Sequence, residues 1–298
     1  MIAKGEFERG AFYMLLSALT LSLFTLSSKF GTDTTPYFLI VFLRFAAPLV
    51  VLVPFLFFTI SFKDLFLKCN LKMQLLRIGC ILIYQYSIFY YLMHAPLTDA
   101  TVMQNTAPLF IPIFERVFFK HPFEKRTLLS ILISFIGVLC VLQPHRSIFA
   151  ELSVVGLLVP LGQAGSQVLY SHQAKSENQK FNLFHLYFLG TVASGIVFLF
   201  VKLFFGAEAS LAPLKAYTLW MWVNLLFLAV TSILNQIFRG ISYQHGKASA
   251  MAPFLYGSII FSAIIDWAVF HHLPSWLSLV GAILVIAGGL IQLAQKNK

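Results

Sequence analysis

Long apolar stretches follow one another along the whole chain, separated by short polar segments. A helix that crosses the hydrocarbon core of a bilayer needs about 20 apolar residues, and a window of that length predicts ten spans. The expected spans are 10–29, 36–60, 74–93, 97–119, 127–143, 153–173, 183–205, 217–238, 247–270 and 275–294. Because the connections between them are short, we expect an all-α integral membrane protein with little mass outside the membrane.

Prolines fall inside several of these spans. Pro108, Pro112, Pro160 and Pro253 each lie within an apolar stretch. A proline inside a helix lacks the N–H that would bond the carbonyl four residues earlier. Each of the four therefore predicts a kink or a freed backbone carbonyl.

Two segments near the ends of the fourth and ninth spans share one pattern. In each, an acid lies within an apolar run, an aromatic residue follows four positions later, and a histidine follows two positions after that. The matching pairs are Glu115 with Asp266, Phe119 with Phe270, and His121 with His272, each 151 positions apart. Gly137 and Gly288 have the same separation. We interpret this as an internal duplication with halves 1–146 and 147–298.

The duplication has a geometric consequence. Each half contains five spans, an odd number, so the second half must enter the membrane in the opposite direction. Inverted repeats of this kind are typical of secondary transporters, whose site lies near the midplane between the halves. The sequence therefore predicts ten transmembrane helices arranged as two inverted five-helix repeats.

Composition excludes an ordinary soluble protein. Hydrophobic residues make up 59% of the chain and charged residues 11%, with a mean hydropathy of +0.83. A net charge of +10 in a soluble protein suggests nucleic acid, but no basic run here is interleaved with polar aromatics, so no nucleic-acid partner is expected. In a membrane protein the same charge indicates loops that face the cytoplasm.

The distribution of lysine and arginine predicts an orientation. With the N-terminus inside, fifteen of these residues fall at the inner face, among them Arg77 and Arg239, and four at the outer face. Positive residues collect on the cytoplasmic side of membrane proteins. We therefore expect a multi-pass protein of the bacterial inner membrane with both termini in the cytoplasm.

An ordered set of short motifs resembles the EamA-type branch of the drug/metabolite transporter superfamily. The first half carries FLRF at 42–45, TDAT at 98–101, TAPLF at 106–110 and FIGV at 135–138. The second half carries GKASAMAP at 246–253, Tyr256 and VGA at 280–282. The resemblance covers nearly the whole chain, although no single motif is specific. Members commonly have a glutamate where this chain has His121 and His272.

The resemblance implies a secondary active transporter that moves a small organic metabolite by alternating access. It also implies a path between the first, third and fourth helices and the sixth, eighth and ninth. Export of an amino acid or related solute is the commonest role in this branch. The alternative is uptake or exchange of a metabolite such as S-adenosylmethionine or a nucleotide-like solute.

Charged and titratable residues within or beside the spans are candidates for coupling or gating. An ionised side chain in the hydrocarbon is costly, so it normally faces protein or water and has a partner. The candidates are Glu115, Asp266, Arg44, His121 and His272. The inversion places Glu115 near the inner face and Asp266 near the outer face. The alternative is structural: each acid caps a contact between helices, and Arg44 forms an ion pair or reaches toward the interface.

Amides and phenols near the middle of the spans are candidates for binding substrate. Such groups are unfavourable against lipid but suit the lining of a wet site. The set comprises Tyr84, Gln104, Asn105, Gln163, Gln167, Tyr170, Asn224, Asn235 and Tyr256. The alternative is that many of them form hydrogen bonds between helices.

Other functional classes lack their characteristic residues. The sequence contains no GxSxG, P-loop or GxGxxG motif, and its three cysteines do not form a CxxC pair, so no enzyme activity, cofactor or metal is expected. A non-transporting membrane enzyme or receptor is the remaining alternative. The expected partners are a small-molecule substrate, the lipid bilayer, and protons or a counter-substrate, with the protein acting as a monomer or homodimer.

Overall fold

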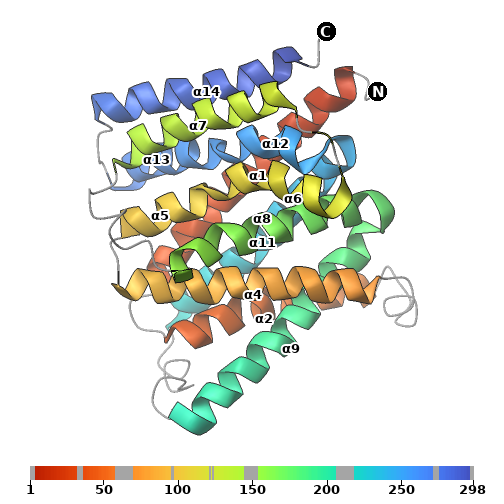
Figure 1. The fold of residues 1–298 in the computed structure, drawn as a ribbon. Helices are drawn as coiled ribbons and strands as arrows, with labels where there is room; N and C mark the ends of the chain where they lie inside the picture. Colours follow the sequence, from red (N-terminus) through yellow and green to blue (C-terminus); the bar gives the residue numbers. More distant parts are fainter. Residues whose placement is uncertain are drawn as a thin grey trace.

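The computed structural model describes residues 4–31, 36–57, 70–94, 97–120, 122, 124–143, 154–205, 218–270 and 275–295. These residues form helices throughout (Figure 1). The helices of the first half are α1 (Lys4–Gly31), α2 (Tyr37–Phe57), α4 (Leu71–His94), α5 (Leu97–Asn105), α6 (Ala107–Phe119) and α7 (Lys125–Leu142). Those of the second half are α8 (Val154–Ser176), α9 (Gln179–Phe205), α11 (Leu219–His245), α12 (Ala248–Leu255), α13 (Gly257–Phe270) and α14 (Trp276–Gln295).

Each predicted span corresponds to a helix or to a pair of consecutive helices. The fourth span is α5 followed by α6, interrupted at Thr106, and the ninth is α12 followed by α13, interrupted at Tyr256. Pro108 lies in the first turn of α6. Because it has no N–H, it cannot donate the helical hydrogen bond to the carbonyl four residues earlier, which lies in α5. Pro253 lies within α12, just before the second interruption. Both prolines thus lie beside the interruptions that they predict.

Seven segments within the described residues are long and apolar enough to cross a membrane. They are α1, α2, α7, α9, α11, the α12–α13 pair and α14. The other three predicted spans, α4, α5–α6 and α8, carry more polar residues or are interrupted. Because lipid offers no hydrogen bonds, the polar helices must lie among the others, and much of α8 is buried accordingly.

The largest difference from the predicted boundaries is at the end of the eighth span. The eighth span was expected to end at residue 238, but α11 continues to His245. The apolar run ends where the polar residues Arg239, Ser242 and Gln244 begin, but the helix continues through these residues. As a result Arg239 belongs to the helix and is only partly exposed, so it is not a loop charge.

Helix packing follows the symmetry expected of an inverted repeat. α1 packs extensively on α11, and α4 on α8. In terms of spans, the first packs on the eighth and the third packs on the sixth. The sixth span is the counterpart of the first, and the eighth is the counterpart of the third. The two contacts are therefore equivalent under exchange of the halves. α2 packs on α9 and α7 on α14, and each of these pairs joins a span to its own counterpart. A two-fold relation between the halves produces this set of contacts.

Individual hydrogen bonds between α7 and α14 obey the same relation. Gln292 Nε2 donates to Thr127 Oγ1 at 3.2 Å, and Ser278 Oγ donates to the Val141 carbonyl at 3.5 Å. Adding 151 to 127 gives 278, and subtracting 151 from 292 gives 141. The separation found in the sequence is therefore also the relation between contacts in three dimensions.

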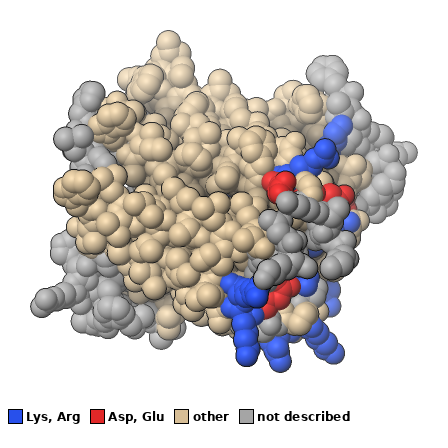
Figure 2. Space-filling view, turned by 90° about the horizontal axis from the view of Figure 1, so that it is seen from above, with Lys and Arg blue, Asp and Glu red and all other residues tan. Residues whose placement is uncertain are grey.

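Charged side chains collect at one end of the bundle. We call this the terminal end, because α1 begins there and α14 ends there (Figure 1). Figure 2 shows blue and red side chains gathered at this end, beside a broad face that is otherwise uncharged. The exposed basic residues at the terminal end are Arg9, Lys72, Arg116, Lys120, Lys125, Arg126, Lys175 and Lys180. At the opposite end, the described residues include the exposed Lys202.

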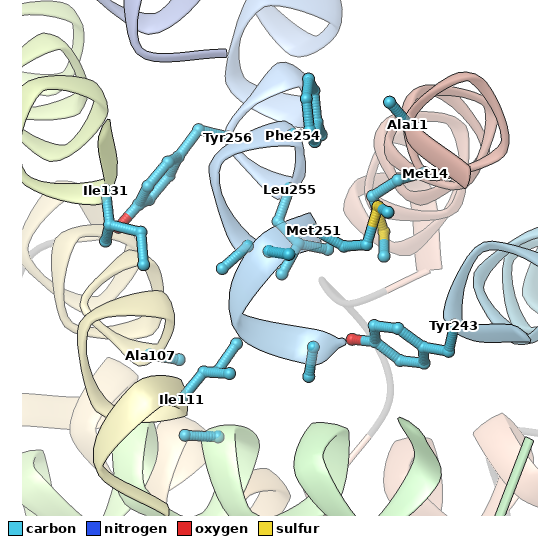
Figure 3. Packing of buried hydrophobic residues seen from close by; sticks show 14 of the residues in the cluster. Ala11, Met14, Ala107, Ile111, Ile131, Tyr243, Met251, Phe254, Leu255 and Tyr256 are labelled. Atoms are coloured by element: carbon cyan, nitrogen blue, oxygen red, sulfur yellow. The ribbon is translucent and has the colours of Figure 1, made fainter. Parts of the chain in front are cut away.

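The largest apolar cluster surrounds α12. Its members come from α1, α6, α7, α8, α11, α12, α13 and α14, so the short helix is packed among helices of both halves. Met14, Met251 and Tyr243 are all fully buried there, and Figure 3 shows their side chains converging beside α12. The packing fixes the position of the first half of the broken ninth span.

Candidate functional site

Glu115 is buried at the terminal end of α6 and contacts the first turn of α12. Its side chain is 4% exposed. Ser249 donates to it twice, from Oγ to Oε2 and from the backbone N–H to Oε1 at 3.3 Å. The residue preceding α12, Lys247, forms no side-chain cap, so Glu115 supplies an acceptor that the helix N-terminus otherwise lacks. One carboxylate thereby joins the broken spans of the two halves.

The two broken spans meet at the terminal end more than at the opposite end. α6 packs extensively against α12, whereas among the described residues α5 and α13 have no comparable contact. Figure 1 shows α6 and α12 toward the terminal end and α5 and α13 toward the other. An exact two-fold relation would make these contacts equal, so the molecule departs from symmetry here.

Arg77 lies at the centre of a second polar cluster, between α4, α8 and α11. It is 2% exposed. Its Nη2 donates to Gln236 Oε1 at 3.1 Å, and its Cζ lies 3.6 Å from the ring centroid of Tyr170. Tyr170 in turn donates to the Gln236 carbonyl at 2.7 Å. The sequence placed Arg77 at the membrane face, but packing of α4 on α8 encloses it.

Three of the predicted substrate-binding residues belong to or adjoin this cluster. Tyr170 stacks on Arg77, and Gln167 accepts a 3.1 Å bond from the Tyr243 hydroxyl. The rings of Tyr170 and Tyr243 meet edge to face, 5.7 Å apart. Gln163, one turn before Gln167 on α8, has a buried Oε1 without a hydrogen-bond partner. The predicted polar stripe on α8 is thus turned toward α4 and α11.

Asn224 and Asn235 join α11 to α1. Asn235 Nδ2 donates to the Ser17 carbonyl at 2.6 Å and to its Oγ at 3.0 Å. Asn224 exchanges hydrogen bonds with Ser27, accepting from Oγ at 2.7 Å and donating to the carbonyl at 2.9 Å. Both amides therefore hold two helices together, as the structural alternative describes. Their role in substrate binding stays a prediction.

Arg44 and Tyr84 lie farther along α2 and α4, away from the terminal end. Arg44 Nη1 donates to Gln85 Oε1 at 2.9 Å, and its Cζ lies 4.7 Å from the Phe24 ring centroid. Arg44 thus connects α1, α2 and α4. The backbone of Tyr84 packs against Gly162, where a Cβ would stand 2.8 Å from the Tyr84 nitrogen. Tyr84 therefore marks the crossing of α4 and α8.

The remaining predicted residues are dispersed. Asn105 ends α5 and donates to the Thr101 carbonyl at 2.8 Å, beside the partly buried Gln104. Tyr256 is 0% exposed, and Figure 3 shows it directed toward Ile131; its hydroxyl is buried without a partner.

The remaining coupling candidates are only partly described. The backbone of Asp266 lies in the last turns of α13. His121 and His272 lie outside the described residues.

Sequence reasoning missed three residues that the structure brings into these clusters. Ser249, Arg77 and Arg239 were not proposed as site residues. A buried arginine one turn inside a predicted span was a usable signal for Arg77. Ser249 carried no such signal, because its partner is 134 positions away. Within the described residues, no group of three histidine, cysteine, aspartate or glutamate side chains gathers to hold a metal ion.

An all-helical bundle of two inverted halves, with one broken span in each and buried polar clusters between them, defines a membrane transport protein. The chain belongs to the EamA-like transporter family, whose model matches residues 8–143 and 155–293. This places it among transporters and not among enzymes. The two matched segments each correspond to one repeat of the fold.

Similarity to individual proteins agrees with the family. The chain is 24% identical over 297 residues to an S-adenosylmethionine uptake transporter of Rickettsia bellii, covering 99% of this chain and 97% of the relative. It is 26% identical over 205 residues to a pseudopaline exporter of Pseudomonas aeruginosa, covering 68% of each. A riboflavin transporter of Brucella anthropi is 23% identical over 208 residues, covering 70% of this chain and 71% of the relative.

A solved crystal structure shows the same fold. It superposes with a TM-score of 0.77 at 16% sequence identity, covering 97% of this chain and 98% of the other. At this identity the likeness concerns the arrangement of helices alone.

Proposed function

We propose that the protein is a secondary transporter that carries a small organic metabolite across the bacterial inner membrane by alternating access. The observation that carries this proposal is the unequal contact of the broken spans. α6 and α12 are joined through Glu115 and Ser249 at the terminal end, while α5 and α13 are not in extensive contact. A transporter closed at one end has this asymmetry, and exchanging the roles of the two halves gives the state closed at the other end.

The distribution of charge supports an orientation with both termini in the cytoplasm. Among the residues that the structure describes, eight exposed lysine and arginine residues gather at the terminal end, and Lys202 lies at the opposite end. Cytoplasmic loops carry an excess of positive residues. In this orientation the Glu115–Ser249 contact closes the cytoplasmic side. The candidate substrate residues on α4, α8 and α11 then lie behind the closed end.

Export of an amino acid or a related solute is the role that we propose first. A relative that covers two thirds of the chain is a pseudopaline exporter. A second candidate, uptake of S-adenosylmethionine or a similar solute, is favoured by a different observation. The relatives that align over nearly the whole chain are S-adenosylmethionine uptake transporters, with 99% of this chain covered in one of them. Both candidates share one mechanism and differ in substrate and direction.

Counterflow in proteoliposomes tests the proposal. Vesicles are loaded with an unlabelled solute and diluted into a trace of the labelled one, with no ATP and no ion gradient. The panel comprises amino acids, pseudopaline, S-adenosylmethionine and riboflavin. We expect transient, saturable accumulation of at least one labelled solute, and slower accumulation in Glu115→Ala. Glu8→Gln, a change at an exposed acid of the same end, is the matched control and should leave the rate unchanged.

The outcomes separate the functional classes. Counterflow of any panel member establishes a transporter, and vesicles sorted by orientation then give its direction. A solute that raises the melting temperature but shows no counterflow would indicate a receptor. If no solute gives either signal across the panel, the transporter proposal is wrong.

A further inference from the structure

The buried guanidinium of Arg77 has hydrogen-bonding capacity that the protein leaves unused. Of its three nitrogens, Nη2 bonds to Gln236, while Nε and Nη1 are buried without a partner. Stacking on Tyr170 compensates part of the charge, but a ring face accepts no conventional hydrogen bond at the guanidinium edge. An arginine has five N–H donors and is always charged, so a buried one needs acceptors.

A second arginine approaches the same place. Arg239 lies one turn after Gln236 on the same face of α11, and its Nε donates to Ser17 Oγ at 3.3 Å. It is close enough for its charge to act on Arg77 and on the hydroxyls of Tyr170 and Tyr243. No ion pair joins either arginine to a carboxylate of the described residues. A buried and a half-buried cation thus lie near each other. The Glu115 carboxylate is close enough for its charge to act on the Tyr243 hydroxyl, but it is hydrogen-bonded to Ser249 and forms no ion pair with either arginine.

Neutral polar groups without partners lie one helical turn from the contact between Arg77 and Tyr170. Gln173, one turn after Tyr170 on α8, is 0% exposed, and both of its side-chain polar atoms lack a partner. Gln74, one turn before Arg77 on α4, donates to Asn182 at 2.5 Å but has an unpartnered Oε1. Native proteins leave few buried polar atoms unpaired. Several unpaired polar groups near two cations that form no ion pair with a described acid indicate a place where a ligand binds.

We infer that Arg77 and Arg239 form a carboxylate-binding subsite of the transport path, with Gln173, Gln74 and the tyrosine hydroxyls available to a polar group beside that carboxylate. The inference rests on the proposed function and narrows it to small metabolites that carry a carboxylate. The planar guanidinium matches the geometry of a carboxylate, and the cluster contributes two positive charges that form no ion pair with an acid of the described residues. Alternating access then includes neutralisation of this pair, because a bound anion removes the repulsion between the arginines.

A purely structural role for Arg77 makes a different prediction. If the guanidinium serves only to hold α4, α8 and α11 together, replacing it lowers stability and slows transport of every solute equally. If it binds a carboxylate, replacing it removes the preference for the charged form of the solute. The ratio of transport of a carboxylate to transport of its carboxamide therefore separates the two roles. Replacing Arg77 changes this ratio if Arg77 binds the carboxylate and leaves it unchanged if Arg77 is only structural.

Counterflow with paired solutes measures that preference in the full-length protein. Amino acids and N-carboxyalkyl amino acids are each compared with their primary carboxamides, and inorganic phosphate is added as a competing anion. In the wild-type protein we expect the carboxylate form to be preferred by about tenfold or more in kcat/KM, the effect of one desolvated charged contact. In Arg77→Gln we expect that preference to fall to about twofold or less while the carboxamide is still carried.

Control variants keep the test decisive. Lys72→Gln changes an exposed cation on the same helix and should preserve the preference. Arg239→Gln should reduce it, and this variant together with Arg77→Lys serves if Arg77→Gln does not fold. An unchanged preference in both arginine variants overturns the inference, as does competition by phosphate that equals that of the carboxylates. Counterflow of neutral solutes alone would overturn the subsite and leave the transporter intact, whereas the absence of any counterflow would overturn the proposed function itself.

Discussion

The backbone of Gly137 on α7 lies directly against that of Gly281 on α14. A Cβ at Gly137 would stand 2.6 Å from the Gly281 carbonyl oxygen, and a Cβ at Gly281 would stand 2.5 Å from the Gly137 carbonyl oxygen. The related contact, obtained by exchanging the halves, joins Gly288 to Ser130, whose Oγ donates to the Gly288 carbonyl at 2.6 Å. Close approach of backbones at small residues is how helices associate inside a membrane. The α7–α14 pair is therefore a scaffold on which the other helices can move.

Replacement of Gly137 by alanine should destabilise the protein without affecting substrate preference. The added methyl group meets backbone atoms that cannot move independently, and overpacking of this kind costs about 1–3 kcal/mol. Gly79→Ala is the matched control, because a Cβ there meets nothing within 4 Å and alanine favours a helix over glycine by about 1 kcal/mol. Thermal unfolding in detergent, followed by tryptophan fluorescence, should show a lower Tm for the first variant and an equal or higher Tm for the second. Equal Tm values for both variants would contradict this account of the crossing.

The contact between Glu115 and Ser249 should show strong energetic coupling. Removing one partner of a charged hydrogen bond costs about 2 kcal/mol, which corresponds to roughly a 30-fold change in the balance between the closed and open states. Glu115→Ala and Ser249→Ala should each slow counterflow, and the double variant should be no slower than the more damaged single variant. Glu115→Gln, which keeps an acceptor oxygen for Ser249, should fall between Glu115→Ala and the wild-type protein. Additive effects of the two alanine substitutions in the double-mutant cycle would show that the residues act independently.

Asp266 should perform the corresponding task at the opposite end. A separation of 151 makes it the counterpart of Glu115. The residues Ala100-Thr101 match Ala248-Ser249 at a separation of 148, so Thr101 on α5 is the counterpart of Ser249. When α5 and α13 close, the Asp266 carboxylate is therefore expected to accept from the first turns of α5. Hydrogen exchange distinguishes the two ends. Glu115→Ala should speed exchange at the start of α12, whereas Asp266→Asn should slow transport and leave exchange at α12 unchanged. Faster exchange at α12 in Asp266→Asn would contradict the assignment of the two acids to different ends.

The helices could be predicted from the sequence because a helix buried in lipid requires a long apolar run. Such a run is recognised from the hydropathy of its own residues, without knowledge of tertiary contacts. The interruptions at Thr106 and Tyr256 were indicated by Pro108 and Pro253 for the same local reason. The end of α11 could not be located by hydropathy, since its last two turns contain Arg239, Ser242 and Gln244. Those turns are stabilised by contacts with α1 and α8 and not by lipid.

The site was less accessible to sequence reasoning, because its contacts join residues far apart in the chain. Glu115 was identified as an unusual intramembrane acid, but Ser249 is an ordinary residue until α6 and α12 are packed together. Polarity alone also cannot separate roles. Asn235 and Gln167 are equally polar in sequence, yet one holds α11 to α1 and the other faces the cluster around Arg77.

Tyr256 and Tyr170 were predicted as substrate residues on the same grounds, and the structure predicts opposite responses to loss of their hydroxyls. The hydroxyl of Tyr256 is buried among apolar side chains without a partner, a situation that costs about 1–3 kcal/mol. Tyr256→Phe removes that cost and should raise Tm without changing KM. The hydroxyl of Tyr170 donates to the Gln236 carbonyl at 2.7 Å, and its ring supports Arg77.

Tyr170→Phe keeps the ring but removes the hydrogen bond from the Tyr170 hydroxyl to the Gln236 carbonyl, so we expect a lower Tm and a higher KM for a carboxylate solute. Measuring Tm by fluorescence and KM by counterflow in both variants separates the two effects. If KM rises as much for Tyr256→Phe as for Tyr170→Phe, Tyr256 lies on the transport path. Its ring would then have to move away from Ile131 in another state of the transport cycle. The same KM for Tyr170→Phe and the wild-type protein would instead restrict the path to residues other than the α8 stripe.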